Sequence, residues 1–363
     1  MKVAINTQTA IGNKSGFGSY VSNLIRYVPQ VSDVEYVSIE NLEYKKDLNT
    51  PQRLFWDQIG FLQKMSQHKG IDLIHQPSFS APIFTTKKTV VTIHDIIPVI
   101  FPENLAPASR FFFSKVMPFS YRFADHYLTD SQHSKNDIME RLHIPDEKIT
   151  VTHLAASEEY RVLNSKADKE KIEGIKKKYN IPEDYFLHIG TIEPRKNISM
   201  LVEAFYEGVV KNKLPYCLVI VGKKGWWYEN LFARVQELGL EKKVIFTGYT
   251  DLEEMPYLCS GATAFTFPSL YEGFGLPPLE AMQCGAPVIC SNASSLPEVV
   301  GEAGILLSPT DQAAWSKALH DVATDEKQRQ KMSLASVEQA KKFSWQKCSE
   351  LTVKVYEDVL KAN

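Results

Sequence analysis

Short apolar runs, separated by polar segments and by glycines and prolines, recur along the whole chain. Most are rich in β-branched residues and too short for helices, which indicates strands buried on both faces. In the first half we predict strands at residues 3–6, 34–39, 71–75, 89–94, 127–129 and 149–153. In the second half we predict strands at residues 185–189, 217–221, 244–246, 262–267 and 288–290.

Segments with helical periodicity lie between these strands. Alternation of strand and helix predicts parallel, doubly wound sheets. Because the series occurs twice, the sequence predicts an α/β protein with two such domains, at residues 1–166 and 167–345. A C-terminal helix follows at residues 346–363, with Leu351, Val355 and Leu360 as its expected apolar face.

One stretch, from Pro268 to Gly285, combines several signals of ligand binding. A predicted strand ends just before it, Gly273 and Gly275 stand in a loop, and two prolines then suit the first turn of a helix. Such a strand–loop–helix unit directs free backbone N–H groups and the positive end of a helix at one point. A phosphate is the natural occupant of that point.

Two carboxylates, Glu272 and Glu280, flank the predicted phosphate position. A carboxylate repels a phosphate, but it is a strong acceptor for the vicinal hydroxyls that sugars and riboses offer. The stretch therefore indicates a nucleotide sugar, with the diphosphate on the amides and one glutamate for each ring. The spacing also allows a plain strand–turn–helix with two surface acids.

The two glutamates, with seven residues between them, resemble the E-x7-E signature of the retaining glycosyltransferase family 4. They lie in the context Pro-Ser-x-x-Glu-Gly-Phe-Gly-Leu-Pro-x-x-Glu-Ala-Met, and the resemblance extends over essentially the whole chain. It implies the GT-B fold, in which two doubly wound, Rossmann-like domains face each other across a cleft. Residues 1–166 would then form the acceptor-side domain, residues 167–345 the nucleotide-sugar-binding domain, and the helix at 346–363 would cross back to the N-terminal domain. It further implies that Glu272 contacts the transferred sugar and Glu280 the ribose. The donor contacts that it implies in the loop are Gly273, Phe274, Gly275 and Leu276.

Two cations, Arg195 and Lys196, follow the predicted strand at 185–189. They lie at a carboxyl strand end beside the start of a helix, where they complement a diphosphate; an ordinary surface loop is the alternative. In the family this loop neutralises the donor diphosphate, and Lys196 matches directly. Many members have Gly-Arg where this chain has Gly190-Thr191, so the resemblance passes the arginine role to Arg195.

The loops after the next two strands carry Gly222 and Tyr249, and family members use these loops around the nucleobase. Together with the Glu-Pro-Arg-Lys-Asn segment, they most resemble bacterial mannosyl- and rhamnosyltransferases of polysaccharide assembly.

In the first half, His94 and Asp95 lie at the carboxyl end of a predicted strand, where open α/β sheets bind ligands. The resemblance places His94 beside the donor sugar, with Asp95 as a candidate to orient it; a core histidine is the alternative. The other family cleft loops, which contact acceptor or phosphate, correspond to Gly16, Phe17, Gly18 and Ser131. Close packing of the glycines and a helix cap at the serine are sufficient alternatives.

Composition narrows the function. The net charge of −2 gives no reason to expect nucleic acid, and no apolar run reaches the ~20 residues of a membrane span. The N-terminus enters a strand pattern directly, so we expect no signal peptide. Five cysteines without C-x-x-C spacing predict buried free thiols and a cytoplasmic location. The aromatic region around Phe111–Phe113, interleaved with basic residues, is either core or a peripheral contact with the inner membrane face.

No Asp-x-Asp occurs, so we expect no metal and no cofactor, with cations of the protein neutralising the diphosphate. The leading hypothesis is a metal-independent retaining glycosyltransferase. It moves a hexosyl unit, mannosyl with GDP-mannose as favoured donor, to a glycan or lipid-linked acceptor of a cell-surface polysaccharide of the O-antigen or capsule kind.

Two other hypotheses remain. A dinucleotide-binding dehydrogenase could use Gly16-x-Gly18, but the third glycine and the acidic residue at a second strand end are missing. A catalytically idle subunit that binds sugar nucleotides is disfavoured by the intact His94, Lys196, Glu272 and Glu280.

Overall fold

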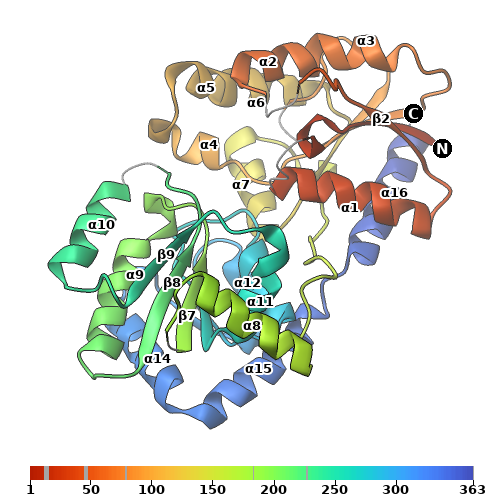
Figure 1. The fold of residues 1–363 in the computed structure, drawn as a ribbon. Helices are drawn as coiled ribbons and strands as arrows, with labels where there is room; N and C mark the ends of the chain where they lie inside the picture. Colours follow the sequence, from red (N-terminus) through yellow and green to blue (C-terminus); the bar gives the residue numbers. More distant parts are fainter. Residues whose placement is uncertain (12–15, 45–47, 78–79, 183, 226–227, 363) are drawn as a thin grey trace. The chain divides into compact units, whose positions relative to one another are not determined.

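The computed structural model describes residues 1–363 except 12–15, 45–47, 78–79, 183, 226–227 and 363 (Figure 1). The chain divides into two compact units. The first comprises Met1–Leu154 with Ser344–Asn363, and the second comprises Ala155–Phe343. Each contains one parallel sheet of six strands, so the prediction of two doubly wound α/β units is confirmed.

The sheet of the first unit has the order β2-β1-β3-β4-β5-β6. Its strands are β1 Lys2–Asn6, β2 Glu35–Ile39, β3 Leu73–Gln76, β4 Lys88–Thr92, β5 His126–Thr129 and β6 Ile149–Val151. Its helices are α1 Gly16–Val31, α2 Thr50–Phe55, α3 Phe61–Met65, α4 Ile97–Ile100, α5 Pro107–Phe111, α6 Met117–Ser120, α7 Gln132–Leu142 and α16 Trp345–Lys361. Wider π-helical turns at Trp56–Gly60 and Phe112–Val116 join α2 to α3 and α5 to α6.

The sheet of the second unit has the order β12-β11-β10-β7-β8-β9. Its strands are β7 Asp184–Ile189, β8 Tyr216–Val221, β9 Val244–Gly248, β10 Ala264–Phe267, β11 Val288–Ser291 and β12 Ile305–Leu307. Its helices are α8 Lys166–Lys178, α9 Ile198–Phe205, α10 Tyr228–Glu237, α11 Met255–Gly261, α12 Leu276–Gln283, α13 Leu296–Val300, α14 Gln312–Thr324 and α15 Glu326–Ala340. A π-helical turn, Tyr206–Val210, extends α9. The sequence analysis missed β12, a three-residue edge strand whose side chains are all half-buried.

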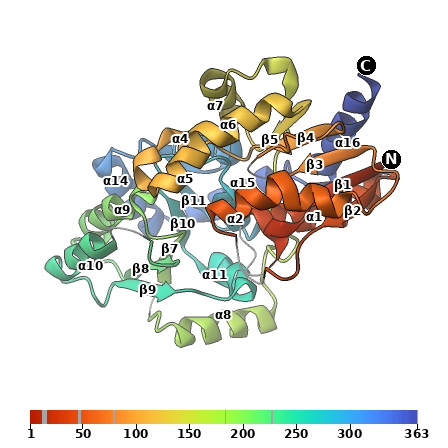
Figure 2. The same cartoon turned by 90° about the horizontal axis from the view of Figure 1, so that it is seen from above.

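The core of the second unit shows why the apolar runs become strands. Phe186 and Leu218 are fully buried on neighbouring strands, and helices α9 and α14 pack against each other in the same cluster (Figure 2). Trp315 of α14 is fully buried there. Strands covered in this way need apolar side chains in nearly continuous runs, which is the pattern that the sequence shows.

The boundaries between the units differ from the expected ones at 166/167 and 345/346. The units divide at 154/155 and 343/344. The earlier boundary has a clear physical reason, since the Gln283 side chain donates hydrogen bonds to the carbonyls of Ser157 (2.9 Å) and Tyr160 (2.6 Å). This holds the segment before α8 on the second unit.

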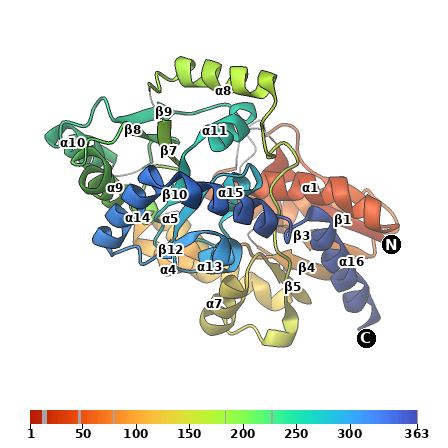
Figure 3. The same cartoon turned by 90° about the horizontal axis from the view of Figure 1, so that it is seen from below.

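The C-terminal helix α16 belongs to the first unit and lies beside α1 (Figures 1 and 3). Its expected apolar face was partly wrong, because Leu351 and Leu360 are 39% and 38% exposed. Val355 is buried as expected, and Tyr356 is buried with it. The hydroxyl of Tyr356 hydrogen-bonds to His75 Nδ1 (2.6 Å) and to the hydroxyl of Tyr36 (2.8 Å).

Two composition-based expectations can be checked. All five cysteines are buried thiols that form no disulfide, as predicted. Among the described helices, none combines the length and the apolarity that a membrane-spanning helix needs.

Candidate active site

The carboxyl edge of the second sheet brings the predicted donor residues together. The strand order changes direction between β7 and β10, and in open α/β sheets ligands bind at such a switch point. The loop that follows β7 carries Arg195 and Lys196, and the loop that follows β10 carries Glu272. The backbone N–H of Leu270 donates to the carbonyl of Arg195 (2.8 Å), which joins the two loops.

Glu272 forms ion pairs with both cations. Its Oε1 lies 2.6 Å from Lys196 Nζ and its Oε2 lies 3.0 Å from Arg195 Nη1. Glu272 is 9% and Lys196 8% exposed. Burial alone would raise the pKa of Glu272, but Lys196 and Arg195 outweigh it and hold that pKa below its usual value. The carboxylate is therefore ionised and screens both cations.

Arg195 is held by more than Glu272. Its Nη2 pairs with Glu193 Oε1 at 2.6 Å, and its Nη1 donates to the carbonyl of Tyr271 at 2.6 Å. Glu193 was missed in the sequence analysis, although an acid just before Pro-Arg-Lys was a visible signal. The arrangement braces the loop that carries Glu272, so Arg195 shapes the site as well as adding charge to it.

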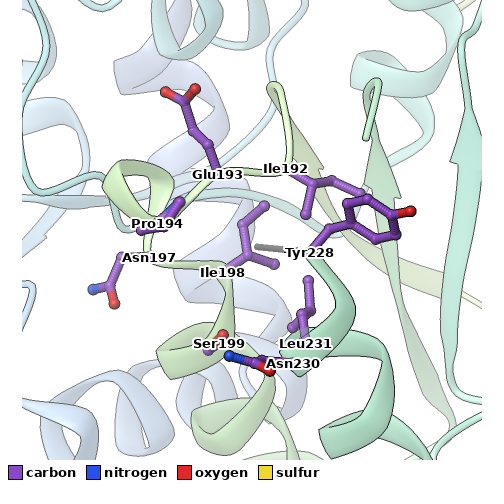
Figure 4. Close-up of a pocket in the computed structure, with 9 residues that line it drawn as sticks. All are labelled: Ile192, Glu193, Pro194, Asn197, Ile198, Ser199, Tyr228, Asn230 and Leu231. Carbon is purple, nitrogen blue, oxygen red and sulfur yellow. The ribbon is translucent and has the colours of Figure 1, made fainter. Parts of the chain in front are cut away.

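A pocket of about 230 Å³ lies between the loop after β7 and helix α10 (Figure 4). Ile198 and Leu231 form part of its lining, and the carboxylate of Glu193 points away from them in Figure 4. Neither Glu272 nor Glu280 lines this pocket.

The glycine loop leads into α12 without a side-chain cap. Gly275 has φ +118°, and a Cβ there would lie 2.8 Å from a methyl of Leu296, so both conformation and space require glycine. The hydroxyl of Ser295 donates to the carbonyls of Glu272 (3.0 Å) and Phe274 (2.6 Å). Pro277 and Pro278 have no N–H, and the N–H of Leu279 donates to the carbonyl of Gly275 (3.3 Å), so Leu276 carries the one N–H that the first turn of α12 can offer to an anion.

Glu280 lies further along α12 in a different environment. Burial raises its pKa to about 8, and a hydrogen bond from the Tyr160 hydroxyl partly offsets this. Tyr160, which the sequence analysis missed, belongs to the segment that enters the second unit. No local pattern pointed to Tyr160, because it is far from α12 along the chain.

The two predicted nucleobase loops also reach this edge. A Cβ on Gly222 would lie 1.9 Å from the carbonyl oxygen of Gly190, so the two loops pack backbone against backbone. Tyr249 is 56% exposed, and Lys223 Nζ lies 5.2 Å from the centre of its ring. Their role in binding a base remains a prediction.

In the first unit, His94 is held by Asp130 rather than by Asp95. His94 Nδ1 lies 2.7 Å from Asp130 Oδ2, and His94 Nε2 lies 2.9 Å from the carbonyl oxygen of Pro77. Burial would lower the pKa of His94, but Asp130 and the Pro77 carbonyl outweigh it and raise that pKa. Both partners accept hydrogen bonds, so the geometry fits an imidazolium with both ring nitrogens protonated.

The hydrogen-bond partner of His94 is thus Asp130, where the sequence analysis had proposed Asp95 as the orienting residue. Asp95 Oδ1 accepts a hydrogen bond from the N–H of Ile97 (2.8 Å) at the start of α4, and its negative charge also raises the pKa of His94. Asp130 follows β5, the neighbour of β4 in the sheet, and the sequence analysis did not single it out. Ser131 is the cap of α7, accepting from the N–H of Ser134 (3.0 Å).

The predicted glycine loop of the first unit lies beside His94. The ring of Phe17 is centred 4.8 Å from the His94 ring, and Tyr20 meets that ring edge-on at 4.7 Å. A Cβ on Gly18 would lie 2.6 Å from the carbonyl oxygen of Thr9, whereas one on Gly16 would meet no heavy atom within 4 Å. Packing therefore explains Gly18, whereas the ligand role of Gly16 stays a prediction.

Comparison with known proteins covers both units. Residues 170–339 match the family "Glycosyl transferases group 1", and residues 28–158 match "Glycosyltransferase Family 4". The chain is 36% identical over 285 residues to O-antigen chain mannosyltransferase B of Escherichia coli, covering 78% of this chain and 74% of that protein. It is 29% identical to O-antigen chain mannosyltransferase RfbU of Salmonella typhimurium, covering 74% of this chain and 69% of RfbU. It also matches WbdA of Escherichia coli with 32% identity over 76% of this chain, but spans only 34% of WbdA.

Solved structures agree on the fold. Sucrose-phosphate synthase of Thermosynechococcus elongatus has a TM-score of 0.77 at 19% identity, with all of both chains covered. The lipopolysaccharide glycosyltransferase WaaG has a TM-score of 0.72 at 13% identity, covering 99% of this chain and 100% of WaaG. From these matches over both halves, together with its two doubly wound sheets, this chain belongs to glycosyltransferase family 4 and is a glycosyltransferase of the GT-B fold.

Proposed function

We propose that this enzyme transfers a mannosyl unit, with retention of configuration, from a nucleoside-diphosphate mannose to a glycan or lipid-linked acceptor in cell-surface polysaccharide synthesis. GDP-mannose is the favoured donor. The observation that carries the proposal is the cluster of Lys196, Arg195 and Glu272 beside the uncapped start of α12. The relatives named as O-antigen mannosyltransferases support the sugar and the pathway class.

In this proposal the donor changes the partners within the cluster. The diphosphate binds the N–H of Leu276 and the backbone of the glycine loop that leads into α12, and it takes over Lys196 from Glu272. Glu272 is then free to accept hydrogen bonds from the transferred sugar, while Glu280 takes the ribose hydroxyls. Lys196 and the amides stabilise the charge that develops on the leaving diphosphate, in a site where few water molecules compete.

The bond changes follow from retention on a single face. The bond between the anomeric carbon and the diphosphate oxygen breaks, and its electrons stay with the diphosphate. The acceptor oxygen bonds to the same face of that carbon, and the diphosphate takes the acceptor proton. We assign His94 to the donor sugar by family resemblance, held as a cation by Asp130.

A thermal-shift panel tests the donor. GDP-, UDP-, dTDP- and ADP-sugars are each added to the protein, and the tightest ligand of the folded state raises the midpoint most. We expect GDP-mannose to give the largest shift and to be hydrolysed slowly without acceptor. A larger shift with another sugar overturns the choice of donor, and binding without any hydrolysis or transfer indicates an idle sugar-nucleotide-binding subunit.

Stereochemistry and metal requirement test the mechanism. Proton NMR of the product from an α-linked donor should show an α linkage, and a β linkage overturns retention. We also expect EDTA to leave the rate unchanged, because two protein cations already face the diphosphate position. Abolition by EDTA with recovery on adding Mg²⁺ or Mn²⁺ would show that the diphosphate assignment is wrong.

We further propose that the protein is a cytoplasmic enzyme, and that exposed aromatic side chains of its first unit contact the inner face of the membrane. Phe111, Phe119 and Phe123 are 64%, 49% and 42% exposed, and the Arg122 guanidinium lies over the Phe119 ring. Phe112 is buried in the core, so only part of the aromatic run is free. Sedimentation with vesicles containing anionic lipid should fall for Phe111→Ser and Phe119→Ser together, and unchanged sedimentation overturns the proposal.

A further inference from the structure

The ammonium group of Lys196 has an aromatic neighbour as well as a carboxylate. Its Nζ lies 4.9 Å from the centre of the Phe267 ring, within the ~6 Å over which a ring face attracts a cation. Phe267 is the last residue of β10 and is fully buried, and Lys196 is buried as well. Solvent therefore screens this attraction less than it screens a pair on the surface.

The loops after β7 and β10 are tied together on either side of this contact. Asn197 follows Lys196 in the left-handed conformation, with φ +56°. Its side chain donates to the carbonyls of Pro268 (3.3 Å) and Pro309 (2.7 Å). Since Pro268 directly follows Phe267, this side chain joins the end of β10 to the residue after Lys196. The place of the lysine beside the ring is thus fixed by the backbone of both loops.

His188 fixes the Phe267 ring from the neighbouring strand β7. The two rings are stacked, with their centres 5.7 Å and their planes 20° apart. His188 Nδ1 lies 3.0 Å from the carbonyl oxygen of Thr266, which can only accept, so Nδ1 carries the proton. Burial lowers the pKa of His188 to about 4, so the imidazole is neutral and does not compete with Lys196 for the ring.

We propose that Phe267 is a positioning residue of the donor site, whose ring holds the Lys196 ammonium in place while that lysine passes from Glu272 to the diphosphate. The proposal rests on the proposed role of Lys196. A ring face attracts a cation through its quadrupole and makes no directed hydrogen bond, so it acts in the same way before and after the anions exchange. The positive charge is then already in place when negative charge develops on the leaving group.

Fluorination of the Phe267 ring tests the proposal with little change in shape. Each fluorine withdraws electron density from the ring face and weakens its attraction for a cation, yet fluorine is close to hydrogen in size. Mono-, di- and trifluorinated phenylalanine replace Phe267 in turn in the full chain. Calorimetry measures the affinity for GDP and for UDP, and steady-state kinetics measure kcat/KM with GDP-mannose. We expect kcat/KM to fall with every added fluorine, by about tenfold in total, and the two affinities to fall less steeply.

Phe265 is the matched control. It lies on the same strand, is fully buried, and its ring stacks with that of Phe267 at 5.9 Å between centres, whereas the contact of Lys196 is with Phe267. The same fluorinated residues in place of Phe265 should change affinity and rate by less than about twofold. Equal losses at the two positions would show a general effect on packing and overturn the proposal, as would a series at Phe267 without a graded loss.

Lys196→Ala, measured alongside, separates this inference from the proposed function. If wild type binds neither GDP nor UDP, or if Lys196→Ala equals wild type in affinity and rate, the diphosphate assignment fails and the inference with it. If Lys196→Ala loses affinity and rate but fluorination of Phe267 changes neither, only the inference fails. In the Lys196→Ala background, fluorination of Phe267 should change affinity by less than about twofold, because the cation that the ring attracts is gone.

Discussion

The loop that carries Glu272 and the helix that carries Glu280 give the same side chain two different environments. Glu272 lies between Lys196 and Arg195 at 2.6 and 3.0 Å, and these cations lower its pKa. For Glu280, eight positions later, burial raises the pKa to about 8, and the Tyr160 hydroxyl only partly offsets this rise. One carboxylate is held ionised by charges, and the other is close to neutral at physiological pH.

The difference teaches how one motif can serve two parts of a donor. A carboxylate paired with cations can exchange them for an incoming diphosphate, so its contacts change during the reaction. A carboxylate in a buried site without a cation keeps its contacts during the reaction. The hydroxyls of a diol can restore the hydrogen bonds that it lost when burial removed its water. We therefore expect Glu272 to act mainly on turnover and Glu280 mainly on affinity.

The largest effect should come from Lys196→Ala, which removes the cation that the diphosphate takes from Glu272. We expect the transition-state stabilisation measured by kcat/KM to fall by about 2–4 kcal/mol, with donor affinity and turnover both reduced. The reason is that the contact between Lys196 and the diphosphate strengthens as negative charge develops on the leaving group. Steady-state kinetics with varied donor measures this. Lys211→Ala, which removes a surface pair with Glu207, is the matched control. An unaltered rate would show that Lys196 is only a counter-ion of Glu272.

Glu272→Gln should have the second-largest effect. We expect the activation free energy reported by kcat to rise by about 2–3 kcal/mol, and the affinity for the bare nucleoside diphosphate to stay nearly intact. The physical reason is that sugar contacts tighten as the transferred ring gains positive charge, whereas the diphosphate never binds Glu272. Removing the carboxylate also frees both cations, so tighter binding of the bare diphosphate fits the same picture. The comparison breaks if Glu272→Gln weakens that ligand as much as Glu280→Gln does.

Glu280→Gln should raise the donor KM about tenfold and leave kcat within about twofold, because ribose contacts are equal in the ground and transition states. Calorimetry with the bare nucleoside diphosphate should show the same loss, since that ligand keeps its ribose. A fall in kcat with an unchanged KM would place Glu280 at the reacting sugar instead.

The last prediction concerns stability and leaves rate and affinity aside. The pKa of Glu280 in the folded protein, about 8, lies above the ~4.3 of free glutamate, so its protonated form stabilises the fold. This contribution is full below about pH 4.3 and is lost as the pH rises through about 8. The pKa of Glu272 is lowered, so its contribution is present above about pH 4.3 and is lost on acidification.

Urea unfolding at about pH 5 and about pH 8 measures this difference. Between these two pH values, the unfolding free energy of wild type should fall more than that of Glu280→Gln. The extra loss should be about 1 kcal/mol for each unit by which folding raises the Glu280 pKa in solution. Glu272→Gln should not remove that decline. Equal slopes in wild type and Glu280→Gln would show that Glu280 is hydrated and ionised at neutral pH.

The sequence by itself determined the class of the fold and the family. Buried parallel strands need continuous apolar runs, and a phosphate-binding turn needs glycines and a helix start at fixed offsets, so both leave local patterns. Eleven of the strands, the positions of Gly275 and Lys196, and the pairing of Glu272 with Glu280 in one motif were all legible in this way. The exception was β12, whose three half-buried residues at a sheet edge show no clear pattern.

Only the tertiary structure decided which side chains meet. Asp130 rather than Asp95 holds His94 because β4 and β5 are neighbours in the sheet, a fact of strand order that residue spacing does not contain. Tyr160 reaches Glu280 across more than a hundred residues of chain. A local pattern reports how a residue relates to its own helix or strand, whereas contacts, and the pKa values that follow from them, depend on how the elements pack.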